Sequence, residues 1–316
     1  MMRHRVEASL ALVILALAAV LLVRAPSFFT AANLVDILLA ALPVLIVATG
    51  ATLVVLTGEI DISVGSVFAI ASVAAGAFAK LDLPMPLVLV LAIGTGATFG
   101  AMNGLLVAAL RLPSIVVTLA AMVALRDGLR WITQGAWIQE LPAGFQWFGL
   151  SQRAYPVVAI GIAAVLLIAV SWALRNLPAG RAIYATGSNA DAARLNGIRT
   201  AHVRFFVFMA AGACTGLAAV LNAVRFNQIP SNAGVGMEMQ VIAAVVVGGT
   251  AITGGRGTLV GTGLGVLLLG AIGPALTFLG ASPYWERALQ GAIILAAVAL
   301  DAYRTCLLYT SPSPRD

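Results

Sequence analysis

Charged and catalytic side chains are scarce in this 316-residue chain. Charged residues make up 9% of it, Lys80 is the only lysine, and the two histidines, His4 and His202, stand far apart. The chain has no Gly-x-x-x-x-Gly-Lys-Ser/Thr loop to cradle a phosphate, no His-Glu-x-x-His pair and no serine in a nucleophile elbow. Its two cysteines, Cys214 and Cys306, give neither a disulfide framework nor the spacing of a metal site. We therefore predict that the chain is not an enzyme and binds no cofactor or metal of its own.

Apolar residues dominate the sequence instead. They make up 61% of the chain, and the mean hydropathy is +1.03. A soluble domain of this length would need far more polar surface. The apolar runs are continuous rather than alternating, and many approach the roughly 20 residues that cross a bilayer as a helix, which favours helices over a β-barrel. We predict an all-α polytopic membrane protein in contact with lipid. Its net charge of +6 comes mostly from arginines at the ends of the runs and does not indicate nucleic acid binding.

Breaks at glycine, proline and charged residues predict a single transmembrane domain over 1–302, with about ten helices. The first apolar run could be a cleaved signal peptide, but further leucines follow its small residues, which favours an uncleaved span. Residues 303–316 contain two closely spaced prolines and are predicted to form a disordered tail that need not be native to the protein. The expected spans are 6–23, 34–56, 63–80, 86–110, 113–131, 155–174, 203–224, 238–252, 258–279 and 284–302.

The distribution of arginine and lysine predicts the orientation of these spans. With the N-terminus in the cytoplasm, the inner side carries eleven basic residues and the outer side seven. Inner loops are usually the more basic ones. We therefore expect both termini, and the connecting segment 175–203, to be cytoplasmic.

The most polar stretch of the chain lies within this segment, from Gly180 to Thr200. Asn189 can cap a short helix over 190–195, and Gly197 suits its end. Asp191 and Arg194 then lie three residues apart on one helix face, where they could pair with each other. A solvated connecting loop is the simpler interpretation, but these caps specify more structure than a passive linker needs. A polar surface between two spans favours a soluble partner.

A second group of polar residues lies near or within the spans. Glu59 and Asp61 are one residue apart in a short loop, and either Asp61 or Ser63 could cap the third helix. A cap at the membrane surface is the preferred interpretation; a gate or substrate contact, and a proton or sodium site, are the alternatives. An asparagine inside a span serves more often as an interhelical hydrogen bond than as a ligand contact. The residues that we assign to a translocation path or gate are Glu59, Asp61, Ser63, Ser66, Asn103 and Glu238.

Glycines at a spacing of four predict close helix packing, because the missing side chain lets another backbone approach. Two such sets are Gly96, Gly100 and Gly104, and Gly257, Gly261 and Gly265. The stretches 54–63 and 246–254 also resemble each other, since each carries an apolar run into a glycine break. This echo suggests two related halves, with short re-entrant or broken helices, as in many transporters.

Three motifs in the chain resemble the membrane permeases of ribose-, xylose-, rhamnose- and autoinducer-2-type ABC importers. They are the run Leu-Thr-Gly-Glu-Ile-Asp-Ile-Ser-Val-Gly-Ser at 56–66, the segment 180–198, and 242–250 followed by Gly-Gly-Arg-Gly at 254–257. Together the resemblance covers residues 30 to 302. The stretches 137–142 and 184–187 look most similar to the rhamnose and autoinducer-2 branch.

This resemblance implies a monosaccharide importer and its partners. In that family the segment matching 180–198 is the coupling element that contacts the ATPase, so we carry this role onto Arg181, Gly187, Asn189, Asp191, Arg194 and Gly197. The resemblance also implies a separate cytoplasmic ATPase subunit that uses ATP and Mg²⁺, a periplasmic sugar-binding protein, and a second permease copy or paralogue. An ion-coupled secondary transporter of a small solute is the alternative, and it requires functional carboxylates deep in the spans.

Overall fold

The computed structural model describes residues 2–282, 284–293, 295–296 and 299, and within this part of the chain it is helical, with one isolated β-bridge between Ile138 and Ile229. In order, the helices are α1 (Met2–Arg24), η1 (Pro26–Phe29), α2 (Ala31–Leu56), α3 (Val64–Lys80), α4 (Met85–Ala109), α5 (Ser114–Thr133), η2 (Gln146–Gly149), α6 (Ala154–Asn176), α7 (Pro178–Ser188), α8 (Ala190–Leu195), α9 (Thr200–Ala223), α10 (Met237–Val247) and α11 (Leu259–Phe278). This confirms the predicted all-α class.

Six of these helices, α1, α2, α4, α6, α9 and α11, are long and apolar enough to cross a membrane. Helix α5 has the length but carries Arg126, Asp127 and Arg130. Helix α10, at the position of the expected span 238–252, ends at Val247 and has only 11 residues. These rise about 17 Å, compared with a hydrocarbon core of roughly 30 Å. This agrees with the predicted short or broken helices.

The end of the chain lies largely outside the described residues. Of the tenth expected span, 284–302, residues 285–293 are helical. The predicted tail 303–316 falls entirely outside the described part of the chain.

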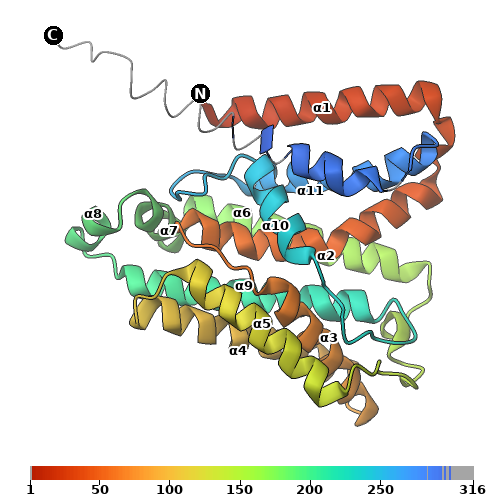
Figure 1. Cartoon of the computed structure of the whole chain (residues 1–316), viewed down its shortest axis with the longest axis horizontal. Coiled ribbons are helices and arrows are strands. Elements are labelled where there is room, and N and C mark those ends of the chain that lie inside the picture. The colour runs from red at the N-terminus through yellow and green to blue at the C-terminus, as the bar shows by residue number, and fades with distance from the viewer. Residues whose placement is uncertain (1, 283, 294, 297–298, 300–316) are drawn as a thin grey trace.

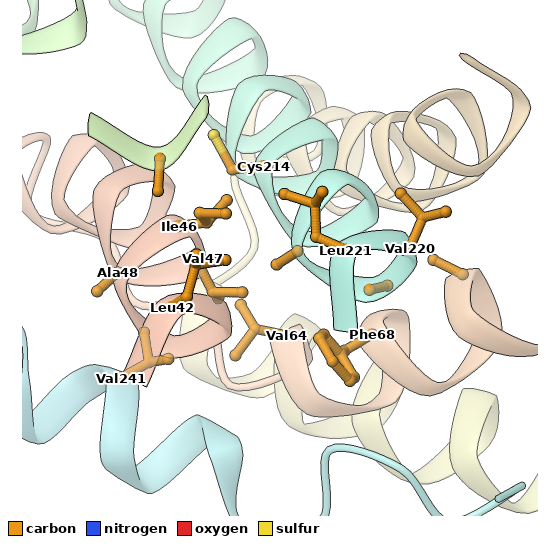
Figure 2. Close-up of a cluster of buried hydrophobic side chains, with 14 of the residues drawn as sticks. Leu42, Ile46, Val47, Ala48, Val64, Phe68, Cys214, Val220, Leu221 and Val241 are labelled. Carbon is orange, nitrogen blue, oxygen red and sulfur yellow. The ribbon is translucent and has the colours of Figure 1, made fainter. Parts of the chain in front are cut away.

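Helix α2 lies at the centre of the molecule and is mostly buried. Its side chains meet those of α3, α9 and α10 in one apolar cluster, in which Leu42, Ile46 and Val47 face Phe68 and Leu221 (Figure 2). Close packing of these side chains gains many van der Waals contacts, and it fixes how the helices are placed relative to one another. The polar loops described below are held at the ends of these packed helices.

Helices α4 and α9 approach each other through backbone contacts. A Cβ added at Gly104 would lie 2.9 Å from the carbonyl oxygen of Phe205, and one at Gly100 would collide with the carbonyl oxygen of Phe208. Gly96 faces the α9 backbone in the same way. These three glycines therefore lie along one face of α4, with no room for a side chain.

The second glycine set is divided by the start of α11. Gly261 and Gly265 lie on α11 and pack against the backbone of α10. Gly257 does not share that face, and its assignment to helix packing was wrong. It precedes the helix, which begins at Leu259 after the Thr258 side chain accepts a hydrogen bond from the Gly261 N–H, and a Cβ at Gly257 would meet Thr250 instead of α10.

Candidate functional site: a loop junction beneath a projecting helix

Helix α8 is the short helix expected from the sequence, with the expected bounds. The Asn189 side chain accepts hydrogen bonds from the backbone N–H groups of Asp191 and Ala192, at 3.0 and 2.9 Å. Gly197 adopts a φ of +81° and its N–H donates to the carbonyl of Arg194, which ends the helix. Asp191 and Arg194 form an ion pair with each other across one turn. The local sequence therefore specifies both ends of α8.

Together, α7 and α8 project from one end of the helical bundle (Figure 1). Leu195, the last residue of α8, is 90% exposed. Arg181, on α7, is also exposed. Helix α7 itself was not expected from the sequence; it begins at Pro178, whose fixed φ suits a first helical position.

The root of this projection is wedged between two loops that are distant in the sequence. A Cβ on Gly187 would collide with the carbonyl oxygen of Leu56 and lie 2.6 Å from the N–H of Gly255. The Gly255 N–H donates a hydrogen bond to that same Leu56 carbonyl, at 2.9 Å. Gly254 in turn lies against Gly58 and Gly187. We call the loop 57–63, the turn 187–189 and the loop 248–258 together the loop junction.

The loop 57–63 is also held by side chains from α4 and α5. The N–H of Ile60 donates to Ser114 Oγ, and that of Ile62 donates to Thr118 Oγ1, both at 3.1 Å. Such bonds satisfy backbone groups that a buried loop would otherwise leave without partners. The loop is therefore a fixed structural element, anchored to the start of α5.

Asp61 and Ser63 form the buried end of this loop, and neither side chain caps α3 as the sequence suggested. Asp61 Oδ1 accepts from both the N–H and the hydroxyl of Ser63, at 2.8 and 2.6 Å. The Ser63 hydroxyl accepts in turn from Asn103 Nδ2 on α4, at 2.8 Å. This network engages the Ser63 hydroxyl, and no helix N–H bonds to it. Burial raises the pKa of Asp61, and the two hydrogen bonds from Ser63 oppose that rise.

Glu59 points instead to the beginning of α9. Its Oε1 lies 2.9 Å from Arg204 Nε, and both side chains are largely shielded from solvent. This ion pair ties the loop 57–63 to the helix that follows the projecting segment. The junction therefore connects α2, α3, α9 and α7 at one end of the bundle.

The remaining polar residues surround the first turn of α3. Ser66 Oγ donates to the Met122 carbonyl on α5, at 2.7 Å. Glu238, in the first turn of α10, is buried and lies 3.6 Å from Arg126 of α5. Gly65 leaves the space for this pair, since a Cβ there would lie 2.9 Å from Arg126 Nη2. A carboxylate at the starts of α10 and α3 is favoured by both helix dipoles.

The predicted path residues thus lie in the loop before α3, in the first turn of α3, and on α4 and α10 where these helices approach it. No functional role follows from their position alone. Sequence reasoning missed the cations that pair with them, Arg204 and Arg126, as well as Ser114 and Leu195. Both arginines were visible as rare charges but were assigned only to the ends of spans. Their partners are set by helix packing, which no local pattern encodes.

Comparison with known proteins finds a family and several relatives. Residues 33–298 match the family model described as the permease component of the branched-chain amino acid transport system. The ribose import permease protein RbsC of Escherichia coli (strain K12) is 34% identical over 292 residues, which cover 91% of each chain. The autoinducer 2 import system permease protein LsrC of Yersinia pseudotuberculosis serotype O:1b (strain IP 31758) is 35% identical over 301 residues, covering 95% of this chain and 86% of that protein. No solved structure matches significantly.

Proposed function

Since this chain belongs to the family of the branched-chain amino acid transport system permease component, and is thus a multi-pass membrane transport subunit, we propose that it is the permease of an ABC importer for a monosaccharide or a similar polyhydroxylated solute. The rhamnose- or autoinducer-2-like branch is our preferred substrate class. Two relatives of similar identity are named for import of ribose and of autoinducer 2. This supports a small polar substrate without a fixed charge.

The observation that carries the coupling role is the connection between α8 and the loop junction. A partner that displaces α8 would move Gly187, which cannot shift without moving the backbone of Leu56 and Gly255. Through these two residues the displacement would reach the ends of α2 and the loop before α11. Closely packed interfaces tend to have two discrete arrangements rather than deform continuously. A small shift of α8 can therefore switch the spans from one arrangement to the other.

In this proposal ATP hydrolysis takes place in a separate cytoplasmic subunit that holds ATP and Mg²⁺. A periplasmic binding protein would deliver the solute, and a second permease copy or paralogue would complete the pathway. The excess of basic residues on the side of 175–203 supports a cytoplasmic α8 and cytoplasmic termini.

An ion-coupled transporter finds less support in the geometry of the path residues. Ion coupling needs a carboxylate that can exchange a proton or cation with the pathway. Glu59 and Glu238 instead face arginines, and Asp61 faces the Ser63 hydroxyl. These contacts fit structural anchoring of the loop better than ion binding.

Co-purification with the cognate ATPase subunit tests the coupling role. We expect Leu195→Asp, and deletion of 189–197, to abolish co-purification, because each removes the exposed tip of α8. Reversing Asp191 and Arg194 together preserves their internal pair, so comparison with each single reversal separates a structural pair from a contact with the partner. Arg153→Asp, outside this segment, is the control. Retention of the ATPase by both the deletion and Leu195→Asp would refute the assignment.

A further inference from the structure

A cavity of about 650 Å³ opens between the turn that joins α4 to α5 and the segment that leads from α8 into α9. Its wall carries four arginines and one carboxylate, Glu59. Two of the arginines have acidic partners: Arg204 pairs with Glu59, and Arg194 pairs with Asp191. The other two, Arg111 and Arg199, have no ion-pair partner among the described residues and are exposed. Among the described residues, the wall therefore keeps two arginines that no carboxylate pairs with.

The position of Arg111 adds a second observation. It follows the end of α4 with a φ of +54°, in the left-handed region that glycine adopts at lower cost. The chain nevertheless places an arginine there, on the wall of the cavity. A left-handed residue just after a helix is a common way to end it, so this conformation fixes where Arg111 lies and does not by itself indicate a ligand.

Apolar residues from the end of α4 and the turn after it also line the cavity. Val107, Leu112 and Pro113 stand alongside the arginines. Close to the lining residues in the sequence, Leu105 on α4 is 55% exposed and Phe206 on α9 is 54% exposed. Gly104 packs against Phe205, so these two exposed side chains lie at the same level of adjacent helices. A molecule with an anionic head and an apolar tail would contact both parts of this surface.

We propose that this cavity is a binding site for the phosphate headgroup of an anionic phospholipid, with an acyl chain along the α4–α9 surface. Arginine guanidinium groups present forked donors that match phosphate oxygens. Basic cavities between spans at the membrane–water boundary are suited to such headgroups. An acidic protein segment would satisfy the arginines equally, but it would not use the exposed apolar surface that continues into the membrane. The inference does not depend on the transported solute, but Arg194 and Gly197 of the lining also belong to the segment assigned to the ATPase, and the test below separates lipid binding from ATPase binding.

The test measures lipid retention by the purified full-length chain. Native mass spectrometry would compare phosphatidylglycerol with phosphatidylcholine of the same acyl chains. We expect the wild type to prefer phosphatidylglycerol, and the double variant Arg111→Gln/Arg199→Gln to lose about 25-fold in affinity for it, from about 5-fold for each arginine. The variant Arg111→Lys/Arg199→Lys keeps both charges and should retain most of the binding. Arg153→Gln, an exposed arginine elsewhere, should behave as the wild type.

Several outcomes would overturn the proposal. Equal retention of both lipids by the wild type, or an equal loss in Arg153→Gln, would show that the cavity does not select the headgroup. Complete displacement of phosphatidylglycerol by inorganic phosphate would indicate a simple anion site. Unchanged lipid binding with a loss of the ATPase in the glutamine variant would assign the arginines to a protein partner. Should the glutamine variant fail to fold, Arg111→Gln and Arg199→Gln alone would each be expected to show their 5-fold share, and the absence of any loss would refute the site.

Discussion

The backbone contact between α4 and α9 leads to a sharp prediction, because α4 contains two glycines of opposite character. A Cβ at Gly96 would collide with the carbonyl oxygen of Gly212 and lie 2.7 Å from the N–H of Gly216. A Cβ at Gly94, half a turn away, would meet nothing within 4 Å. The variants Gly96→Ala and Gly94→Ala therefore differ only in what the added methyl group touches.

The size of the effect follows from two opposing terms. Alanine is favoured over glycine inside a helix by up to about 1 kcal/mol, and this gain applies to both variants. Overpacking costs typically about 1–3 kcal/mol. The obstacles at Gly96 are backbone atoms, which cannot rotate away as a flexible side chain could. We expect Gly96→Ala to have a free energy of unfolding about 1–3 kcal/mol below that of Gly94→Ala, with Gly94→Ala equal to or above the wild type.

Unfolding by titration with SDS, followed by helical circular dichroism, would measure this difference. Because the two sites share one helix, changes in detergent binding or helix content affect both variants alike. A double variant with Gly216→Ala should cost less than the sum of the single changes, since the first substitution already separates the helices. Equal stability of Gly96→Ala and Gly94→Ala would refute the inferred backbone contact.

Three further predictions concern the loop junction. Gly187→Ala should lower the free energy of unfolding by about 1–3 kcal/mol and uncouple ATP hydrolysis from transport, because the loop junction must open to admit the methyl group. Normal coupled transport in the reconstituted complex would contradict the predicted uncoupling. Burial raises the pKa of Asp61 in the folded state, so the contribution of this carboxyl to stability is fully present below the unfolded pKa and is lost as pH rises through the folded pKa. Relative to Asp61→Asn, the wild type should therefore lose stability as pH rises through that range. Parallel pH profiles of the two proteins would show that the carboxyl is not buried as described. For the partly exposed pair of Glu59 and Arg204, removing either partner should cost about 1–3 kcal/mol, and removing both should cost less than the sum. Additive costs in the double-mutant cycle would show that the two groups do not interact.

The sequence allowed local features to be predicted in detail. Helix α8 could be placed with its bounds because its signals are neighbours in the chain: Asn189 reaches N–H groups two and three residues on, and Gly197 supplies its own left-handed turn. The long spans could be predicted equally well, since the length and hydropathy that suit a helix to a bilayer are properties of one continuous run of residues.

Features that depend on contacts between distant segments were harder to predict. Asp61 and Ser63 looked like helix caps, but Asn103 on another helix engages the hydroxyl. Gly257 fitted the spacing of a helix face, but Thr258 begins the helix after it. In both cases the sequence pattern was compatible with two structures, and a neighbouring side chain selected one of them.

Hydropathy and capping act over a few residues, so the pattern of the chain is enough to specify an all-helical membrane protein with a capped polar helix between two spans. What that helix contacts is set by the folded arrangement instead. The meeting of Gly187 with the loops at Leu56 and Gly255, and the pairing of Glu59 with Arg204, depend on how the spans pack. Packing is set by the shapes of whole helix faces, such as the bare glycine face of α4, and these shapes bring together residues whose positions in the sequence give no sign of their contact.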